Sequence, residues 1–212
     1  MLRYAITDRT RFPGDEPTRQ SALVQQAARW SESRIDFIQL REKDLPPADL
    51  AALARRIQAA MWSAGPGTKL LINSRADIAL ATHADGVHLT SNPGELTPAQ
   101  IRQLFAAASL PTPVISISCH TLAEVARIAA SPTKDRPTHI LFGPVFEKVV
   151  TNETHADTLI SAGTGLDLLR QACILAAPTP VLALGGITPE NTAASLAAGA
   201  AGIAAIRLFM EL

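Results

Sequence analysis

Val181-Leu-Ala-Leu-Gly185 is a short apolar run that ends in glycine, and seven similar runs recur along the 212-residue chain. Runs of this length are typical of buried strands in a parallel sheet. Segments with helical spacing, rich in alanine, leucine and arginine, separate most of them. The other seven runs are Arg3–Thr7, Asp36–Leu40, Lys69–Asn73, Gly86–Leu89, Val114–Ser118, His139–Gly143 and Gly202–Ile206.

Eight alternating strand and helix units predict an α/β fold, a TIM (β/α)8 barrel, with residues 1–212 as a single domain. Only six residues follow Ile206, so the eighth helix is expected to be short or absent. A reduced eighth helix leaves apolar barrel surface, which a second copy of the chain would cover. A homodimer is therefore one expectation.

The composition excludes several classes of function. Lys plus Arg and Asp plus Glu balance at 19 each, which gives no support for binding to nucleic acid or to a membrane surface. An N-terminal apolar leader and a long apolar stretch are both lacking, so we expect a cytoplasmic protein. Cys119 and Cys173 lack the spacing of metal ligands and are expected to be reduced thiols.

Two polar segments interrupt the pattern, Thr7–Gln20 and Gly143–Gly163. Both follow predicted strands, so both are expected above the catalytic face as covers for a substrate; plain surface loops are the alternative. The first two helices are expected over Ser21–Trp30 and Ala48–Ile57.

The active site of such a barrel lies where its strands end, at their C-terminal ends. This rule converts the fold into a set of candidate residues. They are Thr7, Asp8, Gln39, Arg41, Lys43, Asn73, His88, Ser118, His120, Gly185, Gly186 and Arg207.

Gln39-Leu-Arg-Glu-Lys43 is the strongest local signal. If strand geometry persists to Lys43, the side chains of Gln39, Arg41 and Lys43 share one face. One amide and two cations at the barrel mouth suit an anionic, phosphate-bearing ligand. The alternative is a solvated basic strand end paired with Glu42 and Asp44.

Gly185 and Gly186 end the seventh run, just before a helix expected at Thr188. Glycines at this point, followed by the backbone of the eighth strand, form the usual phosphate cradle of these barrels. A tight strand-to-helix turn is the alternative, and it is compatible with the cradle.

Imidazole titrates near neutral pH, so His88 and His120 are candidates for proton exchange. Ser118 and His120 are expected on one face, which favours a catalytic or ligand role for His120. His88 is either a ligand contact or a buried, hydrogen-bonded residue. The other histidines are expected in the scaffold or in loops: His83, His139 and His155.

Seven ordered motifs together resemble the thiamine phosphate synthase/TenI superfamily of TIM barrels. The resemblance covers nearly the whole chain. The motifs are Tyr4–Asp8, Ile38–Lys43, Leu71–Leu80, Ala84–Leu89, Ser118–Val125, Phe142–Phe146 and Ala183–Ile187.

The resemblance implies one of two activities. The synthase joins a hydroxymethylpyrimidine pyrophosphate to a thiazole phosphate and expels pyrophosphate with Mg²⁺. The TenI-type tautomerase aromatises a carboxythiazole phosphate by moving a proton, without a metal. Its proposed general acid/base is the histidine of the strand-five motif, which falls on His120.

Departures from the synthase pattern favour the tautomerase. Ser74 stands where that pattern has an aspartate, and Thr90–Pro93 replaces a segment that carries an acidic Mg²⁺ ligand, although Asp77 and Glu95 are nearby in sequence. The Thr-x-Thr-Lys loop is also missing, with Lys148 an uncertain substitute. Mg²⁺ binds through carboxylates and ligand phosphates, so we expect no metal site and no cofactor, with Mg²⁺ required only if the protein is a synthase.

We therefore expect a thiazole tautomerase in which His120 moves the proton and Ser118 positions it or the substrate. Arg41 and Lys43 would hold the carboxylate of a phosphorylated thiazole. Two alternatives stay open: a synthase with altered metal ligands, and a non-catalytic protein that binds thiazole or thiamine phosphate. The remaining expected substrate and phosphate contacts are Tyr4, Gln39, Asn73, His88, Gly185, Gly186 and Arg207.

Overall fold

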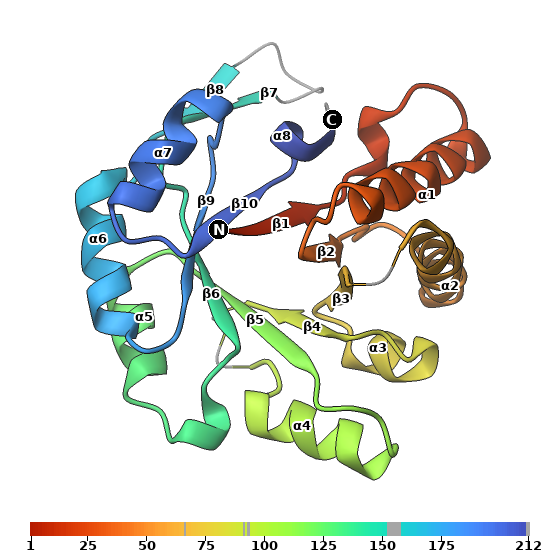
Figure 1. Ribbon diagram of the computed structural model, residues 1–212, viewed down its shortest axis with the longest axis horizontal. Coiled ribbons are helices and arrows are strands. Elements are labelled where there is room, and N and C mark those ends of the chain that lie inside the picture. The colour runs from red at the N-terminus through yellow and green to blue at the C-terminus, as the bar shows by residue number, and fades with distance from the viewer. Residues whose placement is uncertain (66, 91, 93, 152–157, 211–212) are drawn as a thin grey trace.

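The computed structural model describes residues 1–65, 67–90, 92, 94–151 and 158–210. Eight parallel strands close into a barrel in the order β1-β10-β9-β6-β5-β4-β3-β2, which confirms the predicted fold (Figure 1). Each strand overlaps the run predicted for it. The strands are β1 Leu2–Ile6, β2 Phe37–Leu40, β3 Lys69–Asn73, β4 Gly86–Leu89, β5 Val114–Cys119, β6 His139–Phe142, β9 Val181–Leu184 and β10 Gly202–Ala205.

Helices surround the barrel and pack on its outer face (Figure 1). Local sequence determines where several begin. Thr97 caps α4, since its hydroxyl accepts the backbone N–H of Gln100 while the Gln100 side chain accepts the N–H of Thr97. The main helices are α1 Glu16–Glu32, α2 Pro47–Ala64, α3 Ala76–Thr82, α4 Pro98–Ala107, α5 Leu122–Ala129, α6 Gly165–Ala176 and α7 Pro189–Ala197.

The first two helices are longer than predicted. The carboxylate of Asp15 accepts the N–H of Thr18 at 3.0 Å, so α1 begins at Glu16 inside the segment expected to be a loop. A 3₁₀ turn, η1 (Arg9–Arg11), occupies another part of that segment.

The segment between β6 and α6 also contains more structure than predicted. Strands β7 (Lys148–Thr151) and β8 (Thr158–Ser161) pair antiparallel, so the segment Gly143–Gly163 holds a hairpin. His155, expected in a loop, lies outside the described residues. Whether the hairpin covers a substrate stays a prediction.

Alternation along the strands separates two regions of apolar packing. One set of side chains fills the barrel interior, and the opposite set packs beneath the helices. Polar side chains lie above the interior apolar set, toward the C-terminal ends of the strands. The interior set is Tyr4, Ile6, Leu71, Leu141, Leu182 and Ala204.

The chain after β10 forms one short helix, α8 (Arg207–Met210), as the sequence predicts. Phe209 is 2% exposed, and its carbonyl oxygen accepts the indole N–H of Trp30 at 2.7 Å. Helix α8 is therefore fixed against α1. The homodimer stays a prediction. Among the described residues, helices long and apolar enough to cross a membrane are absent.

Candidate functional site

His88 and Ser118 meet at the mouth end of the barrel interior. His88 Nε2 lies 2.9 Å from the hydroxyl oxygen of Ser118, and Nδ1 lies 2.7 Å from that of Ser116. The Tyr4 hydroxyl lies 3.0 Å from Ser116 beneath them. These contacts form a hydrogen-bonded chain from the mouth into the barrel.

Burial determines the protonation state of the titratable groups in this hydrogen-bonded chain of side chains. His88 is 4% exposed, and burial lowers its pKa to about 3, with the charges of His139 and Arg41 acting in the same direction. His88 is therefore neutral at physiological pH. Of the two roles expected for His88, its burial and its contacts with Ser116 and Ser118 agree with that of a buried, hydrogen-bonded residue.

Tyr4 departs from the expected substrate contact. Its side chain is fully buried in the interior apolar set, and burial raises the pKa of its hydroxyl well above the usual value. The hydroxyl already contacts Ser116 and lies 3.4 Å from His88 Nδ1. Tyr4 therefore lies one layer deeper in the barrel than the mouth, among apolar side chains, and its hydroxyl contacts the polar layer above it.

Gln39 and Asn73 extend the polar layer on the neighbouring strands β2 and β3. The amide nitrogen of Gln39 donates to the Asn73 side-chain oxygen at 2.7 Å. Gln39 is 1% exposed, and its Oε1 has no hydrogen-bond partner among the described residues. An unsatisfied buried acceptor is costly, so this oxygen suits a donor on a bound molecule.

His120 lies just beyond β5 and is exposed at the mouth. Its Nδ1 lies 2.6 Å from the carbonyl oxygen of Gly143, at the end of β6. A carbonyl only accepts, so Nδ1 carries the hydrogen and Nε2 of the neutral ring keeps a lone pair. Ser118 and His120 do not bond to each other: Ser118 contacts His88, although both residues belong to the mouth.

Gly185 and Gly186 form the turn between β9 and α7. Gly186 has φ of +65°, and a Cβ there would lie 2.5 Å from the carbonyl oxygen of Glu147. The N–H of Phe146 donates to the Gly185 carbonyl at 3.1 Å, and the Asn191 amide donates to that of Gly186 at 2.8 Å. Glycine is thus required by both backbone conformation and space.

Strand β2 ends at Leu40, so strand geometry does not persist to Lys43 as the sequence argument assumed. Even so, Arg41 is half-buried, Glu42 is buried and Lys43 is exposed. The side chains of Arg41 and Lys43 make no hydrogen bond or ion pair with the rest of the described chain. The pairing of these two cations with Glu42 and Asp44, one part of the alternative interpretation, is therefore wrong, whereas a solvated strand end stays an alternative.

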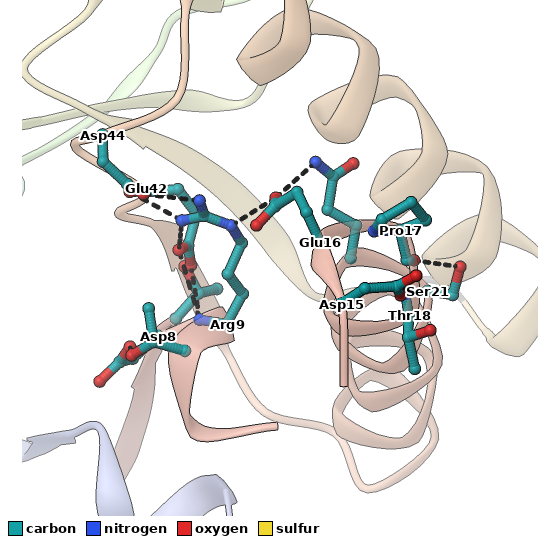
Figure 2. Close-up of polar contacts among 12 residues, drawn as sticks. Asp8, Arg9, Asp15, Glu16, Pro17, Thr18, Ser21, Glu42 and Asp44 are labelled. Carbon is teal, nitrogen blue, oxygen red and sulfur yellow. Dashed lines mark hydrogen bonds and ion pairs between the residues drawn. The ribbon is translucent and has the colours of Figure 1, made fainter. Parts of the chain in front are cut away.

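Glu42 and Asp44 pair instead with Arg9, which the sequence argument did not single out (Figure 2). A signal for this pair exists in the sequence. Arg9 and Glu42 each follow one of two adjacent parallel strands, β1 and β2, so both residues lie at the same end of the barrel.

Arg207, the last expected phosphate contact, is the exposed first residue of α8 and follows the last residue of β10 by two positions. Its position at the end of a barrel strand agrees with the rule that placed it among the candidates. Among the histidines expected in the scaffold, His139 is buried in the barrel and His83 ends α3.

The residues near Ser74 do not fit a magnesium site. The Ser74 hydroxyl donates to Glu95 Oε1 at 3.1 Å, and the backbone N–H of Thr90 donates to Glu95 Oε2 at 2.7 Å. Glu95 is therefore engaged within the protein. Within the described ranges, groups of three or more acidic, histidine or cysteine side chains placed to hold a metal are absent.

Fold and site together define a TIM barrel with a polar mouth, an exposed histidine held by a backbone carbonyl, and two cations without ionic partners in the described part of the chain. The family model described as thiamine monophosphate synthase matches residues 3–209, and the chain belongs to that family.

Curated relatives and a solved structure agree with this assignment. The chain is 38% identical to a putative thiamine-phosphate synthase of Geobacter sulfurreducens, over 96% of this chain and 84% of the relative. It is 32% identical to putative thiamine-phosphate synthase 2 of Aquifex aeolicus, over 98% and 97% of the two chains. Thiamine phosphate pyrophosphorylase from Pyrococcus furiosus superposes with a TM-score of 0.72 at 26% identity, covering 100% of this chain and 88% of that one.

The chain is thus a thiamine-biosynthesis enzyme by family. These relatives are named as synthases, the activity that the sequence analysis keeps as an alternative to the tautomerase.

Proposed function

We propose that this protein isomerises a carboxythiazole phosphate by moving a proton, as a TenI-type tautomerase. The observation that carries the proposal is the contact between His120 Nδ1 and the Gly143 carbonyl, which directs the basic Nε2 lone pair away from the backbone. An exposed imidazole held in one tautomer by a backbone carbonyl is suited to general acid–base catalysis.

The reaction needs no electron transfer and no leaving group. Nε2 of His120 takes a proton from a ring carbon of the substrate, and the resulting imidazolium returns a proton at a second ring position. The number of protons and electrons is unchanged, and the ring becomes aromatic. A single histidine suffices for both transfers if the substrate is held still.

Charged and polar groups at the ends of other barrel strands would bind such a substrate. Arg41 and Lys43 lack ionic partners in the described chain and suit a carboxylate. The glycine turn at Gly185 and Gly186 offers backbone N–H groups to a phosphate. Arg207 follows β10, and β10 is the strand that pairs with β9, after which the glycine turn lies. The unsatisfied Gln39 Oε1 accepts a hydrogen bond from the substrate.

The names of the relatives favour a second candidate, a thiamine phosphate synthase. Against it stands the chemistry of the residues around Ser74, where the resemblance implies Mg²⁺ ligands. Both nearby carboxylates in the described part have partners within the protein: Glu95 accepts hydrogen bonds from Ser74 and Thr90, and Asp77 pairs with Arg75. We therefore keep the tautomerase as the first proposal.

One assay separates the two candidates. Hydroxymethylpyrimidine pyrophosphate and thiazole phosphate are incubated with the protein in Mg²⁺ and in EDTA, and released pyrophosphate is measured. The tautomerase proposal predicts no release in either buffer. Mg²⁺-dependent release would make the protein a synthase.

A further inference from the structure

Arg9 is an arginine buried at the edge of the mouth, just after β1. It is 4% exposed, and its guanidinium contacts three carboxylates (Figure 2). Nε donates to Glu16 at 2.7 Å, Nη1 to Glu42 at 3.0 Å, and Nη1 and Nη2 form a two-pronged contact with Asp44 at 2.7 and 2.6 Å. Arginine alone has the planar fork for such a set of contacts.

Two of these carboxylates flank Lys43 in the sequence. Asp44 is half exposed or more, and its hydrogen bond from Arg9 lowers its pKa. Glu42 is buried, and desolvation raises its pKa despite hydrogen bonds from Thr7 and Arg9 that act in the opposite direction. Without the Arg9 guanidinium, Glu42 and Asp44 would be unneutralised acids adjacent in sequence to Lys43.

The same network fixes the backbone at Arg41. The Thr7 hydroxyl donates to Glu42 Oε1 at 2.5 Å and accepts the backbone N–H of Arg41 at 2.9 Å. The backbone N–H of Arg9 adds contacts with both Glu42 oxygens at 3.2 and 3.3 Å. The ends of β1 and β2 are thereby joined through one buried carboxylate.

We propose that Arg9 is a positioning residue for the anion-binding segment: it occupies Glu42 and Asp44, so that Arg41 and Lys43 stay available to an anionic group of the substrate. The inference rests on the proposed function, since it assumes that these two cations bind an anion. The ligand chemistry is a carboxylate or a phosphate.

A purely structural role for Arg9 makes a different prediction. A buried ion pair is weak support for stability, because removing both partners is often tolerated while removing one is not. The two roles are therefore separated by removing first Arg9 alone and then Arg9 together with its two acids.

The test measures the dissociation constant of inorganic pyrophosphate by calorimetry at low ionic strength, with the full chain. Arg9→Gln removes the guanidinium charge from both acids and is expected to weaken binding about tenfold. The triple variant Arg9→Gln/Glu42→Gln/Asp44→Asn removes the competing charges and is expected to restore binding to within about threefold of the unmodified protein. Glu16→Gln, the matched control, removes the third contact of Arg9 and is expected to leave binding unchanged.

Two results would overturn the inference: an Arg9→Gln protein that folds and binds pyrophosphate normally, or a folded triple variant as weak as the single one. If Arg9→Gln does not fold, Arg9→Lys replaces it, because the ammonium group of lysine cannot reproduce the two-pronged contact with Asp44 together with the contacts to Glu42 and Glu16. Normal binding by Arg9→Lys would equally contradict the inference.

Failure of the proposed function gives a different pattern. If Arg41→Gln/Lys43→Gln binds pyrophosphate as well as the unmodified protein, these cations are not an anion site, and the assumption beneath the inference is wrong. If that variant loses binding while the Arg9 variants keep it, only the role of Arg9 is wrong. Binding of pyrophosphate does not require turnover, so the readout is independent of the reaction catalysed.

Discussion

His120 donates the hydrogen on Nδ1 to the carbonyl oxygen of Gly143 across 2.6 Å, which joins the ends of β5 and β6. The contact fixes the tautomer of the ring and leaves Nε2 as the only basic nitrogen. Gly143 is itself held in place, because its N–H donates to the Cys119 carbonyl at 3.1 Å. The orientation of the base is thus set by the barrel.

Replacing this base tests its role. His120→Gln removes the titrating group, and we expect turnover of the carboxythiazole phosphate to fall by about 10²- to 10⁴-fold with a small change in KM. Steady-state kinetics measure both. His83→Asn is the matched control, because His83 is exposed at the end of α3 with φ of +54°, a conformation that asparagine tolerates. A His120→Gln enzyme with normal turnover would contradict the mechanism.

The two cations are expected to act through binding. Arg41→Gln or Lys43→Gln should raise KM by about tenfold and change kcat little, because a charge–carboxylate contact contributes to ground state and transition state alike. The effect should shrink at 0.5 M salt, which screens exposed charges. Arg55→Gln, on the outer helix α2, is the control. An unchanged KM would exclude these side chains from substrate binding.

Much of the fold was predictable because the strands of a parallel barrel are short, apolar and separated by helices of clear period. The predictions were less accurate where capping decided a boundary. The side chain of Asp15 adds a turn before the apolar spacing of α1 begins, so the helix starts at Glu16 and not at Ser21. The β7–β8 hairpin has no comparable apolar alternation to reveal it.

The site was predictable at the level of strand ends and less so for individual contacts. Strand β2 ends at Leu40, so alternation does not determine where the side chains of Arg41, Glu42 and Lys43 point. The partner of Glu42 depends on a contact between residues 33 positions apart. Depth along a strand is also hard to predict from sequence. Tyr4 and His88 both point inward, yet Tyr4 lies one layer below and is closed off from the mouth.

His139 is expected to make stability depend on pH. It lies 4.7 Å from Phe37, between ring centroids, and burial lowers its pKa to about 4. An unfolded histidine titrates near 6.5, so between these values the unfolded chain binds a proton that the native chain does not, and the free energy of unfolding falls as pH falls. From pH 8 to pH 5 the loss is about 2 kcal/mol for this residue.

Urea denaturation of the protein and of His139→Phe at pH 8 and pH 5 measures this contribution. Phenylalanine keeps a ring against Phe37 and Tyr4 but does not titrate. On acidification, the free energy of unfolding of the variant should therefore fall by about 2 kcal/mol less than that of the unmodified protein. His83→Asn again serves as the control. Equal losses in His139→Phe and the unmodified protein would show that His139 does not titrate in this way.

Gly186→Ala tests the glycine turn. The new Cβ would lie 2.5 Å from the Glu147 carbonyl oxygen at a φ of +65°, so we expect both a lower stability, by about 2 kcal/mol, and a higher KM for the phosphorylated substrate. Thermal unfolding and steady-state kinetics report the two effects.

Gly165→Ala is the matched control for the glycine turn. Gly165 has φ of +84°, but nothing lies within 4 Å of an added Cβ, so only the backbone strain is shared. The Gly165→Ala variant should be less stable by about 1 kcal/mol and have an unchanged KM. An unchanged KM in Gly186→Ala would remove the turn from the phosphate site.

The central claim is a metal-independent proton transfer by His120. The most direct measurement follows aromatisation of the carboxythiazole phosphate tautomer by ultraviolet absorbance in EDTA, with the unmodified protein and with His120→Gln. The account predicts rapid aromatisation by the unmodified protein and a loss of at least about 100-fold in the variant. No acceleration by the unmodified protein, or equal acceleration by both, would contradict it.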